Sequence, residues 1–467
     1  VAILVLFVLY IQINDSHIKS IPDRANALSP LRWTPESIKE QAEKFKSEEE
    51  KGLKRSIKDQ LPPKTGRRYI VVGGSGFLGG WIVNQLLERG ETPHHIRLVD
   101  LRPPLRKDLL TGPARQTQFI PADVSSLPSL LQAFSAPWPT NVSLDTEITI
   151  FHTAANIRFF ERHLDVLPLS TGVNVDGTKN VIEASKRIGA TVLVYTSSAS
   201  VAIRRSQFFL WPWQKEPKHF VQIIDDKEEK DNPVLPRKHE EYFSNYAVSK
   251  IAAEKYVREA DRSPTGSEKG LGLLRTGVLR PGNCIYGPRG DPLFGACLLR
   301  HINPTWHHQS IQSFLYVENC ALAHLLYEAR LLPSPKGSRD RNPDIGGQFF
   351  IIVDPGPTRT YGDVYMQLET LSGGETYFPV MSATGLLVVA YLVEWYYLIR
   401  LRPSLLTRTL TTLLPPLSAA LMNLQPALFF LTSVHAIFDD SRARLPPSQG
   451  GLGYQGVWTT FEGICKT

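Results

Sequence analysis

One stretch, Tyr69 to Gly80 with the sequence YIVVGGSGFLGG, constrains the fold more than any other part of the chain. Its first four residues are β-branched or aromatic, which is typical of a buried parallel strand. A glycine-rich turn follows, and apolar residues then recur at helical spacing. This order leaves backbone N–H groups and a helix N-terminus free to hold a pyrophosphate. The residues expected at this nucleotide site are Gly73 in the tight turn, Gly76 at the closest approach, Gly79 in helix packing, and Phe77 and Leu78 between them.

An acidic residue about 20 positions further on supports this interpretation. Residues Ile96 to Val99 form a second predicted strand, and Asp100 closes it. A carboxylate at this place accepts hydrogen bonds from both ribose hydroxyls and repels a 2′-phosphate, so NAD is favoured over NADP. Arg102 tempers this preference, because its guanidinium could receive that phosphate. A Rossmann domain without a nucleotide is the alternative.

Strand and helix signals then alternate, as a doubly wound parallel sheet requires. Residues 118–121 and 148–155 are the third and fourth predicted strands. After the third, the Asp123 carboxylate is expected to reach the adenine amino group, with Val124 beside it. Small residues near the end of the fourth, including Ala154, leave room for the cofactor. The predicted fold class is therefore α/β, with a Rossmann-type doubly wound parallel sheet.

Chemistry is indicated by a tyrosine and a lysine that follow the fifth predicted strand, residues 191–198. Tyr246 and Lys250 stand four residues apart, so on a helix they share one face. An ammonium beside a phenol lowers a phenol pKa that is about 10 in water. The tyrosine can then exchange a proton with an alcohol or ketone, while a serine at the strand end bonds the same oxygen and the lysine holds the nicotinamide ribose. A half-buried aromatic on an amphipathic helix is the alternative for Tyr246.

Composition limits the other classes of function. The 467 residues have a formal net charge of +7, but 45 acidic residues are interspersed among the basic ones. Without a basic stripe, no nucleic-acid partner is expected. The four cysteines show no paired spacing, so we expect reduced thiols in a cytosol-facing domain and no metal site.

The N-terminal segment is apolar at first and then charged. Residues 1–14 begin VAILVLFVLYIQI, which is too short to span a bilayer, and we interpret them as part of a truncated membrane anchor. A buried strand or helix is the alternative. Residues 15–67 are interpreted as a charged helical linker, in which Thr34 followed by Pro35 predicts a helix start.

Taken together, these motifs resemble the extended short-chain dehydrogenase/reductase family. Within it, the chain is most similar to the branch of 3β-hydroxysteroid dehydrogenases and sterol-4α-carboxylate 3-dehydrogenases (decarboxylating). The likeness covers about residues 68–463 and depends on GGSGFLG, TSSAS, YAVSK, LRPGNCIYGP, NVDGTKNVIEAS and FLYVENCALAH. The site residues that it implies are Ser198 as the hydroxyl partner, with Ser197 as the fallback, Tyr246 as proton donor or acceptor, Lys250 as its activator, and Pro281, Asn283 and Ile285 beside the nicotinamide.

The chain departs from the family in the connection between Ser198 and Tyr246, which is longer than usual. It contains Phe208 to Trp213, FFLWPW, with basic residues on both sides. Exposed aromatic residues with basic neighbours are typical of a membrane interface. We expect either a lid that dips into the bilayer surface or a loop packed over the protein itself.

Three parts are expected beyond the linker. Residues 68–283 form the NAD-binding domain with the catalytic residues, 284–380 a smaller substrate-binding part, and 381–467 an apolar membrane-associated region with the C-terminal tail. In the last part, residues 385–398 and 405–431 are strongly apolar and suit helices lying in one leaflet. A buried helical pair is the alternative.

The resemblance thus implies an NAD-dependent oxidoreductase that converts the 3β-hydroxyl of a sterol or steroid-like substrate to the ketone. It would be membrane-associated at the endoplasmic reticulum, face the cytosol and form a homodimer. Loss of a C4 carboxylate would need no further catalytic residue, because a β-keto acid loses CO₂ readily, whereas Δ5–Δ4 isomerisation would need a further acid or base. The alternatives are a nucleotide-sugar epimerase or dehydratase on the same fold and a catalytically silent NAD-binding scaffold.

Overall fold

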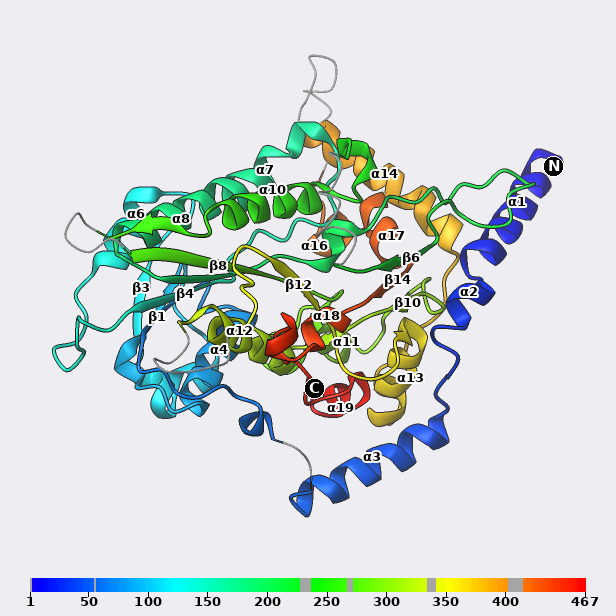
Figure 1. The fold of residues 1–467 in the computed structure, drawn as a ribbon. Helices are drawn as coiled ribbons and strands as arrows, with labels where there is room; N and C mark the ends of the chain where they lie inside the picture. The colour runs from blue at the N-terminus through cyan, green and yellow to red at the C-terminus, as the bar shows by residue number, and fades with distance from the viewer. Residues whose placement is uncertain (1, 54–55, 227–236, 267–271, 334–341, 402–414) are drawn as a thin grey trace.

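The computed structural model describes residues 2–53, 56–226, 237–266, 272–333, 342–401 and 415–467 (Figure 1). Its centre is a sheet of eight described strands in the order β12-β8-β5-β4-β1-β2-β3, all parallel along this path, with β7 antiparallel to β8. The bounds are β1 Arg68–Val72, β2 Ile96–Asp100, β3 Gln118–Pro121, β4 Ile148–His152, β5 Val192–Thr196, β7 Ser263–Thr265, β8 Gly272–Pro281 and β12 Phe349–Ile352.

The strand order reverses between β1 and β4, because the chain runs outward through β2 and β3 and then returns to the other side of β1. At such a point the connections leave in opposite directions and open a crevice at the carboxyl ends of the strands. The doubly wound parallel sheet predicted from the sequence is confirmed. The predicted strands at 148–155 and 191–198 are shorter than expected, which leaves Ala154 and Ser198 just beyond the strand ends.

Helices cover both faces of this sheet (Figure 1). On one face lie α4 (Phe77–Glu88) and α12 (Val317–Leu331), and on the other α6 (Leu127–Ser135), α8 (Gly177–Arg187) and α10 (Asn245–Glu259). In β1, Tyr69 and Val71 join the first layer, while Ile70 and Val72 join the second. All four side chains are buried, because alternate residues of a strand face opposite sides and both sides are covered.

A smaller part holds two further sheets. One has the order β13-β10-β14-β6 and the other pairs β11 with β9. The bounds are β6 Val221–Ile224, β9 Ile285–Tyr286, β10 Ile311–Gln312, β11 Leu315–Tyr316, β13 Arg359–Thr360 and β14 His435–Phe438. Strand β6 lies in the long Ser198–Tyr246 connection, and β14 lies in the region that we expected at the membrane. Strand β6 pairs in parallel with β14, and β14 pairs in parallel with β10. Both segments are therefore part of this sheet.

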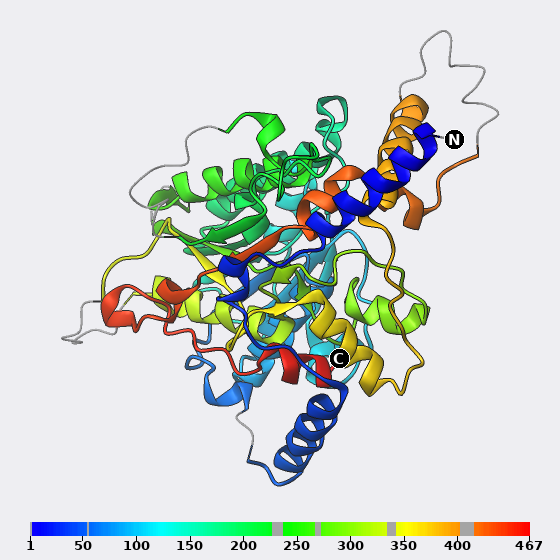
Figure 2. The ribbon, with the colours of Figure 1, turned by 90° about the vertical axis from the view of Figure 1, so that its right-hand side faces the viewer.

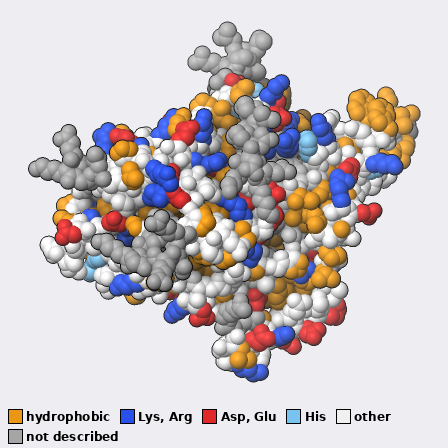
Figure 3. All heavy atoms as spheres, viewed as in Figure 1, with side chains coloured by type: hydrophobic (Ala, Val, Ile, Leu, Met, Phe, Trp, Pro, Cys, Tyr) orange, Lys and Arg blue, Asp and Glu red, His pale blue; other side chains and the backbone are white. Residues whose placement is uncertain are grey.

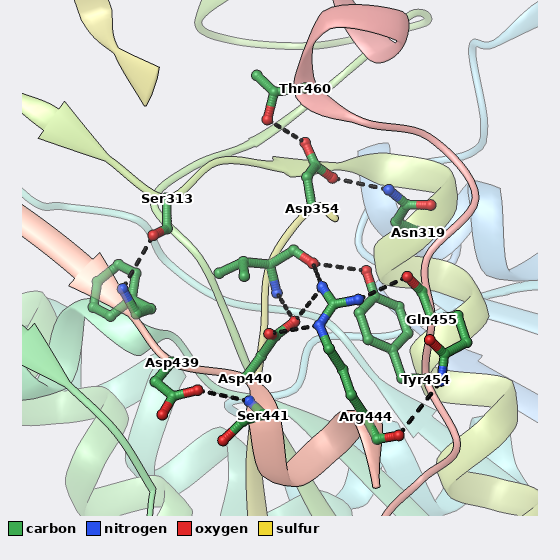
Figure 4. A network of polar contacts seen from close by, with 12 residues as sticks. Ser313, Asn319, Asp354, Asp439, Asp440, Ser441, Arg444, Tyr454, Gln455 and Thr460 are labelled. Carbon is green, nitrogen blue, oxygen red and sulfur yellow. Dashed lines mark hydrogen bonds and ion pairs between the residues drawn. The ribbon is translucent and has the colours of Figure 1, made fainter. Parts of the chain in front are cut away.

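The end of the chain is fastened to this body by a buried polar network (Figure 4). Arg444 donates two hydrogen bonds to the Asp440 carboxylate, at 2.8 and 2.7 Å. Asp354, just after β12, accepts hydrogen bonds from Asn319 at 2.9 Å and from Thr460 at 3.1 Å. Burial raises the pKa of Asp354 to about 7, because those hydrogen bonds only partly offset the loss of water.

The N-terminal helices are α1 (Ala2–Ile18), α2 (Asp23–Asn26) and α3 (Pro35–Glu50). The helix start predicted at Pro35 is confirmed, with Ser37 N donating to Thr34 Oγ1 at 3.2 Å. Helix α3 packs on α13 and α19, while α1 lies beside α14 (Figure 2). The remaining helices of four or more residues are α5 Lys107–Leu110, α7 Pro168–Thr171, η3 Gly112–Gln116, η5 Gly172–Asp176, η6 Ala199–Ala202, α11 Phe294–Arg300, α13 Tyr361–Leu371, α14 Ala383–Leu401, α16 Ala419–Asn423, α17 Pro426–Thr432, α18 Ser441–Arg444 and α19 Thr460–Cys465.

Apolar side chains are exposed on α1, where they form the large hydrophobic area at the upper right of Figure 3. Within the described residues, α14 is the helix that is long and apolar enough to cross a membrane by length and composition. Leu392 and Trp395 on α14 are exposed by 59% and 63%. Residues 402–414, part of the apolar stretch expected at 405–431, lie outside the described residues.

Candidate active site

The glycine turn after β1 has the geometry that the sequence predicts for two of its glycines. Gly73 has φ +85°, and a Cβ there would lie 2.6 Å from Thr153 Oγ1. A Cβ on Gly79 would lie 2.1 Å from the Gly73 carbonyl oxygen, so α4 approaches the turn more closely than any side chain permits. Gly76 is the N-cap of α4, offers no side-chain cap and is exposed. The turn therefore presents bare backbone at a helix N-terminus.

A hydroxyl and a carboxylate complete this cradle. Ser75 Oγ is buried and has no hydrogen-bond partner among the described residues. The Asp100 carboxylate, at the end of β2, accepts hydrogen bonds from Ser75 N at 3.2 Å and Arg102 N at 3.4 Å. Backbone free of side chains, an unpaired hydroxyl and an acidic strand end fit the phosphates and ribose of a dinucleotide.

Other predicted cofactor residues lie along the same sheet edge. Asp123 is exposed after β3, and one carboxylate oxygen accepts hydrogen bonds from Ser125 N at 2.9 Å and Ser125 Oγ at 2.7 Å. The Val124 carbonyl accepts from Asn180 at 3.0 Å. Ala154 follows β4, and its N–H donates to the Val72 carbonyl at 3.1 Å. Phe77 and Leu78 open α4.

The predicted catalytic side chains meet at the end of β5. Helix α10 begins at Asn245, so Tyr246 and Lys250 lie one turn apart near its N-terminus. The Tyr246 hydroxyl is enclosed and lies near the Ser198 side chain, although part of the residue is exposed. Ser198 Oγ also lies 2.7 Å from Ser200 Oγ. Ser197, the fallback candidate, has a buried hydroxyl without a partner among the described residues.

The partners of Lys250 in this structure are groups of β5 rather than Tyr246. Its Nζ donates to the Thr196 carbonyl at 2.6 Å and lies 4.3 Å from the centre of the Tyr195 ring. Burial lowers the pKa of Lys250 to about 7 and raises the pKa of Tyr246 to about 12, with the Ser198 hydrogen bond opposing the latter. The predicted lowering of the tyrosine pKa is therefore wrong for this structure, because the loss of water outweighs the opposing effect of the Ser198 side chain.

A second layer of polar residues, not predicted from the sequence, holds these groups. Thr196 Oγ1 lies 2.7 Å from His324 Nε2, which fixes the strand end that receives Lys250. Asn174 donates to Ser249 Oγ at 2.9 Å and accepts from Asn156 N at 2.7 Å. Asn174 belongs to the NVDGTKNVIEAS motif, so its motif was the available signal. Thr196 opens the TSSAS motif and His324 closes the FLYVENCALAH motif, so the same kind of signal was available for both.

The residues expected beside the nicotinamide join the two parts of the molecule. Pro281 ends β8, and Ile285 begins β9. Between them, Asn283 donates to Gln312 Oε1 of β10 at 3.3 Å. Gln312 in turn donates to the Val434 carbonyl at 3.0 Å, next to β14. This loop therefore connects the carboxyl end of β8 in the large sheet with the sheet that contains β10 and β14.

Residues 70–377 match the profile of the 3-beta hydroxysteroid dehydrogenase/isomerase family. The chain belongs to this family. It is 29% identical over 375 residues to 3 beta-hydroxysteroid dehydrogenase type 7 of Mus musculus, covering 76% of this chain and 86% of that protein. It is 26% identical over 418 residues to 3beta-hydroxysteroid-dehydrogenase/decarboxylase isoform 1 of Arabidopsis thaliana, covering 86% and 79%. The resemblance seen in the sequence is confirmed, and the chain is an oxidoreductase of the type that acts on CH–OH groups.

Solved structures agree on the fold. UDP-glucose 4-epimerase of Thermotoga maritima has a TM-score of 0.52 at 18% identity, covering 86% of this chain and 97% of that one. The Thermus thermophilus UDP-glucose 4-epimerase complex with NAD has a TM-score of 0.50 at 18% identity, covering 86% and 93%. At such identities the likeness shows the Rossmann-type fold alone. It gives no support to a nucleotide sugar as the substrate of this chain.

Proposed function

We propose that this protein oxidises the 3β-hydroxyl of a sterol or steroid-like substrate to the 3-ketone, with NAD as the hydride acceptor. The observation that carries the proposal is the placement of Ser198 and of Tyr246 and Lys250 together at the end of β5, on the sheet edge that holds the glycine turn. The apolar cluster packed around Tyr246 suits a steroid skeleton better than a nucleotide sugar. Residues 68–283 would form the NAD-binding domain and 284–380 the substrate-binding part.

The residues that would hold the cofactor are those of the glycine turn, with Asp100 on the ribose and the loop Pro281 to Ile285 beside the nicotinamide. NAD supplies a hydride acceptor when bound. The Asp100 carboxylate already accepts two backbone hydrogen bonds at the cradle, and its negative charge disfavours a 2′-phosphate. We therefore propose NAD rather than NADP.

In the proposed mechanism, Ser198 donates a hydrogen bond to the substrate oxygen, and Tyr246 in its phenolate form takes the proton of the hydroxyl and becomes the neutral phenol. Lys250 is about half protonated near neutral pH, because its pKa is lowered to about 7. Its ammonium form would stabilise the Tyr246 phenolate once Nζ exchanges the Thr196 carbonyl for the phenol. Until that exchange occurs, the Thr196 carbonyl holds the amine of Lys250.

The fate of the ketone depends on the substrate. A carboxylate at C4 makes the product a β-keto acid, which loses CO₂ as the electron pair of the broken bond forms an enolate. This step needs no further catalytic group, and one relative is named as a decarboxylase. Isomerisation of a Δ5 double bond would need an additional acid or base, so we favour decarboxylation.

We further propose that α1, α14 and the loop around Trp211 attach the protein to a membrane. Asn14 is buried where the three meet: it donates to the Phe208 carbonyl at 2.9 Å and to Thr384 Oγ1 at 2.8 Å, and accepts from Leu210 N at 3.1 Å. Phe208 is buried, whereas the rings of Trp211 and Trp213 are stacked and 61% and 74% exposed. Exposed indoles beside apolar helices suit a bilayer surface.

The four described cysteines are free thiols, which supports a catalytic domain on the cytosolic side, and we propose the endoplasmic reticulum as the membrane. The function is tested with the detergent-purified protein, NAD and a panel of 3β-hydroxysterols, with UDP-glucose as the competing substrate. Formation of NADH with a sterol supports the proposal. Turnover of UDP-glucose, or none with any sterol, contradicts it.

A further inference from the structure

Beside the apolar cluster that contains Tyr246, two arginines lie against the ring of Phe430, and among the described residues only one of them pairs with a carboxylate. Arg162 pairs with Glu394 of α14 through two hydrogen bonds of 2.7 and 2.6 Å. Arg205 has no carboxylate within ion-pair distance among the described residues. Within the described part of the chain, this pair of arginines therefore has one carboxylate in ion-pair contact for two positive charges.

Aromatic rings enclose this charge. The Arg205 guanidinium carbon lies 4.6 Å from the centre of the Phe430 ring, and Arg162 lies 5.6 Å from the same centre. Tyr391 of α14 also lies close to the Arg205 guanidinium. Burial, reinforced by Arg162, lowers the pKa of Arg205, as expected for a cation that lacks compensation. A guanidinium whose face stacks on a ring still has N–H groups along its edges. It can bind a carboxylate through two of these N–H groups.

The backbone links the segment that holds Arg205 to the two elements that carry the catalytic groups. It follows Ser198 after the short helical turn η6, and its N–H donates to the Glu241 carbonyl at 2.9 Å, five residues before Tyr246. Phe430, on which Arg205 stacks, belongs to the same apolar cluster as Tyr246. Arg205 is thus held between the strand end that carries the serine and the helix start that carries the tyrosine.

We propose that Arg205 binds a carboxylate of the substrate next to its 3β-hydroxyl, which selects an acidic sterol over a neutral one. This inference rests on the proposed function. Loss of CO₂ moves negative charge away from the carboxylate, toward the ketone oxygen near Tyr246. A cation on the carboxylate therefore favours binding and orientation and does not accelerate the bond cleavage, so Arg205 is a specificity residue whose effect falls on KM.

The experiment compares two substrates and three variants. In detergent micelles with NAD, KM and kcat are measured for a 4α-carboxy-3β-hydroxysterol and for the matching 4α-methyl sterol. Arg205→Gln should raise KM for the acid about 10- to 100-fold, the range of a hydrogen bond to a charged group, and change KM for the methyl sterol by less than about twofold. For Arg205→Lys, KM for the acid should lie between the wild-type and Arg205→Gln values, because lysine keeps the charge but cannot donate two parallel N–H bonds to one carboxylate. Arg204→Gln, an exposed neighbour, should match the wild type.

Equal losses on both sterols, or none on either, would overturn the inference. Arg205→Lys keeps the test valid if the glutamine variant fails to fold. A lipid phosphate could supply the same chemistry, so both variants are also tested on vesicles with and without phosphatidylserine. Weaker binding to the anionic vesicles with unchanged sterol selectivity would assign Arg205 to the lipid and refute the substrate site. If the wild type oxidises neither sterol, the proposed function itself fails.

Discussion

The substitution Gly79→Ala tests the glycine turn as a cofactor cradle. The added Cβ would lie 2.1 Å from the Gly73 carbonyl oxygen and 2.9 Å from Gly74 Cα. Both are backbone atoms, so the turn or α4 must move by about 1 Å to reach ordinary contact distance. Overpacking of this kind costs about 1–3 kcal/mol of folding stability. A displacement of about 1 Å at a positioning element can cost about 10²-fold in function.

The assay is isothermal titration of NAD into the purified variant, together with its thermal unfolding. We expect NAD affinity to fall by at least about tenfold in protein that is still folded at the assay temperature. The matched control is Gly172→Ala in η5, where a Cβ would meet no atom within 4 Å and alanine favours the helical backbone. Unchanged NAD affinity in Gly79→Ala would refute the assignment of this turn to the cofactor.

Three more predictions concern the ribose site, the buried lysine and the membrane face. Asp100→Ser should raise KM for NAD about tenfold and lower it for NADP, since a charged hydrogen-bond acceptor and its repulsion of phosphate are both lost; an unchanged ratio of the two would contradict the ribose assignment. The folded pKa of Lys250, about 7, lies below its ordinary 10.5, so its contribution to stability is present above pH 10.5 and is lost as the pH falls to 7. Lys250→Met should therefore remove a slope of up to about 1.4 kcal/mol per pH unit in that window, measured by urea unfolding, and parallel curves for the two proteins would show that the amine is not buried. Asn14→Ala removes three hydrogen bonds and should reduce flotation with liposomes, as should serine at both Trp211 and Trp213; full flotation of both variants would contradict attachment through this face.

The parts of the site that lie within one strand, turn or helix could be predicted from the local sequence pattern. The run YIVV has strand residues throughout, and only glycine fits the contacts at 73 and 79, so the turn could be predicted. The i,i+4 spacing placed Tyr246 and Lys250 on one helix face for the same reason.

Features that depend on contacts between distant segments could not be predicted. The partner of Lys250 is the carbonyl of Thr196, 54 residues earlier, which no periodicity indicates. Strands β6 and β14 have four residues each and pair across more than 200 positions, so their partnership has no sequence signal. The sign of the Tyr246 pKa shift depended on how much water burial removes, and the sequence suggested only the neighbouring charge.

The central claim is that the Tyr246 hydroxyl exchanges a proton with the substrate alcohol. The most direct measurement is the rate of NADH formation by Tyr246→Phe with a 3β-hydroxysterol, beside Tyr242→Phe, a buried tyrosine four residues earlier that lies outside α10. The account predicts a loss of about 10²–10⁴-fold in kcat for Tyr246→Phe with NAD affinity unchanged, and near-normal turnover for Tyr242→Phe. A Tyr246→Phe enzyme that turns over within a few-fold of the wild type would contradict it.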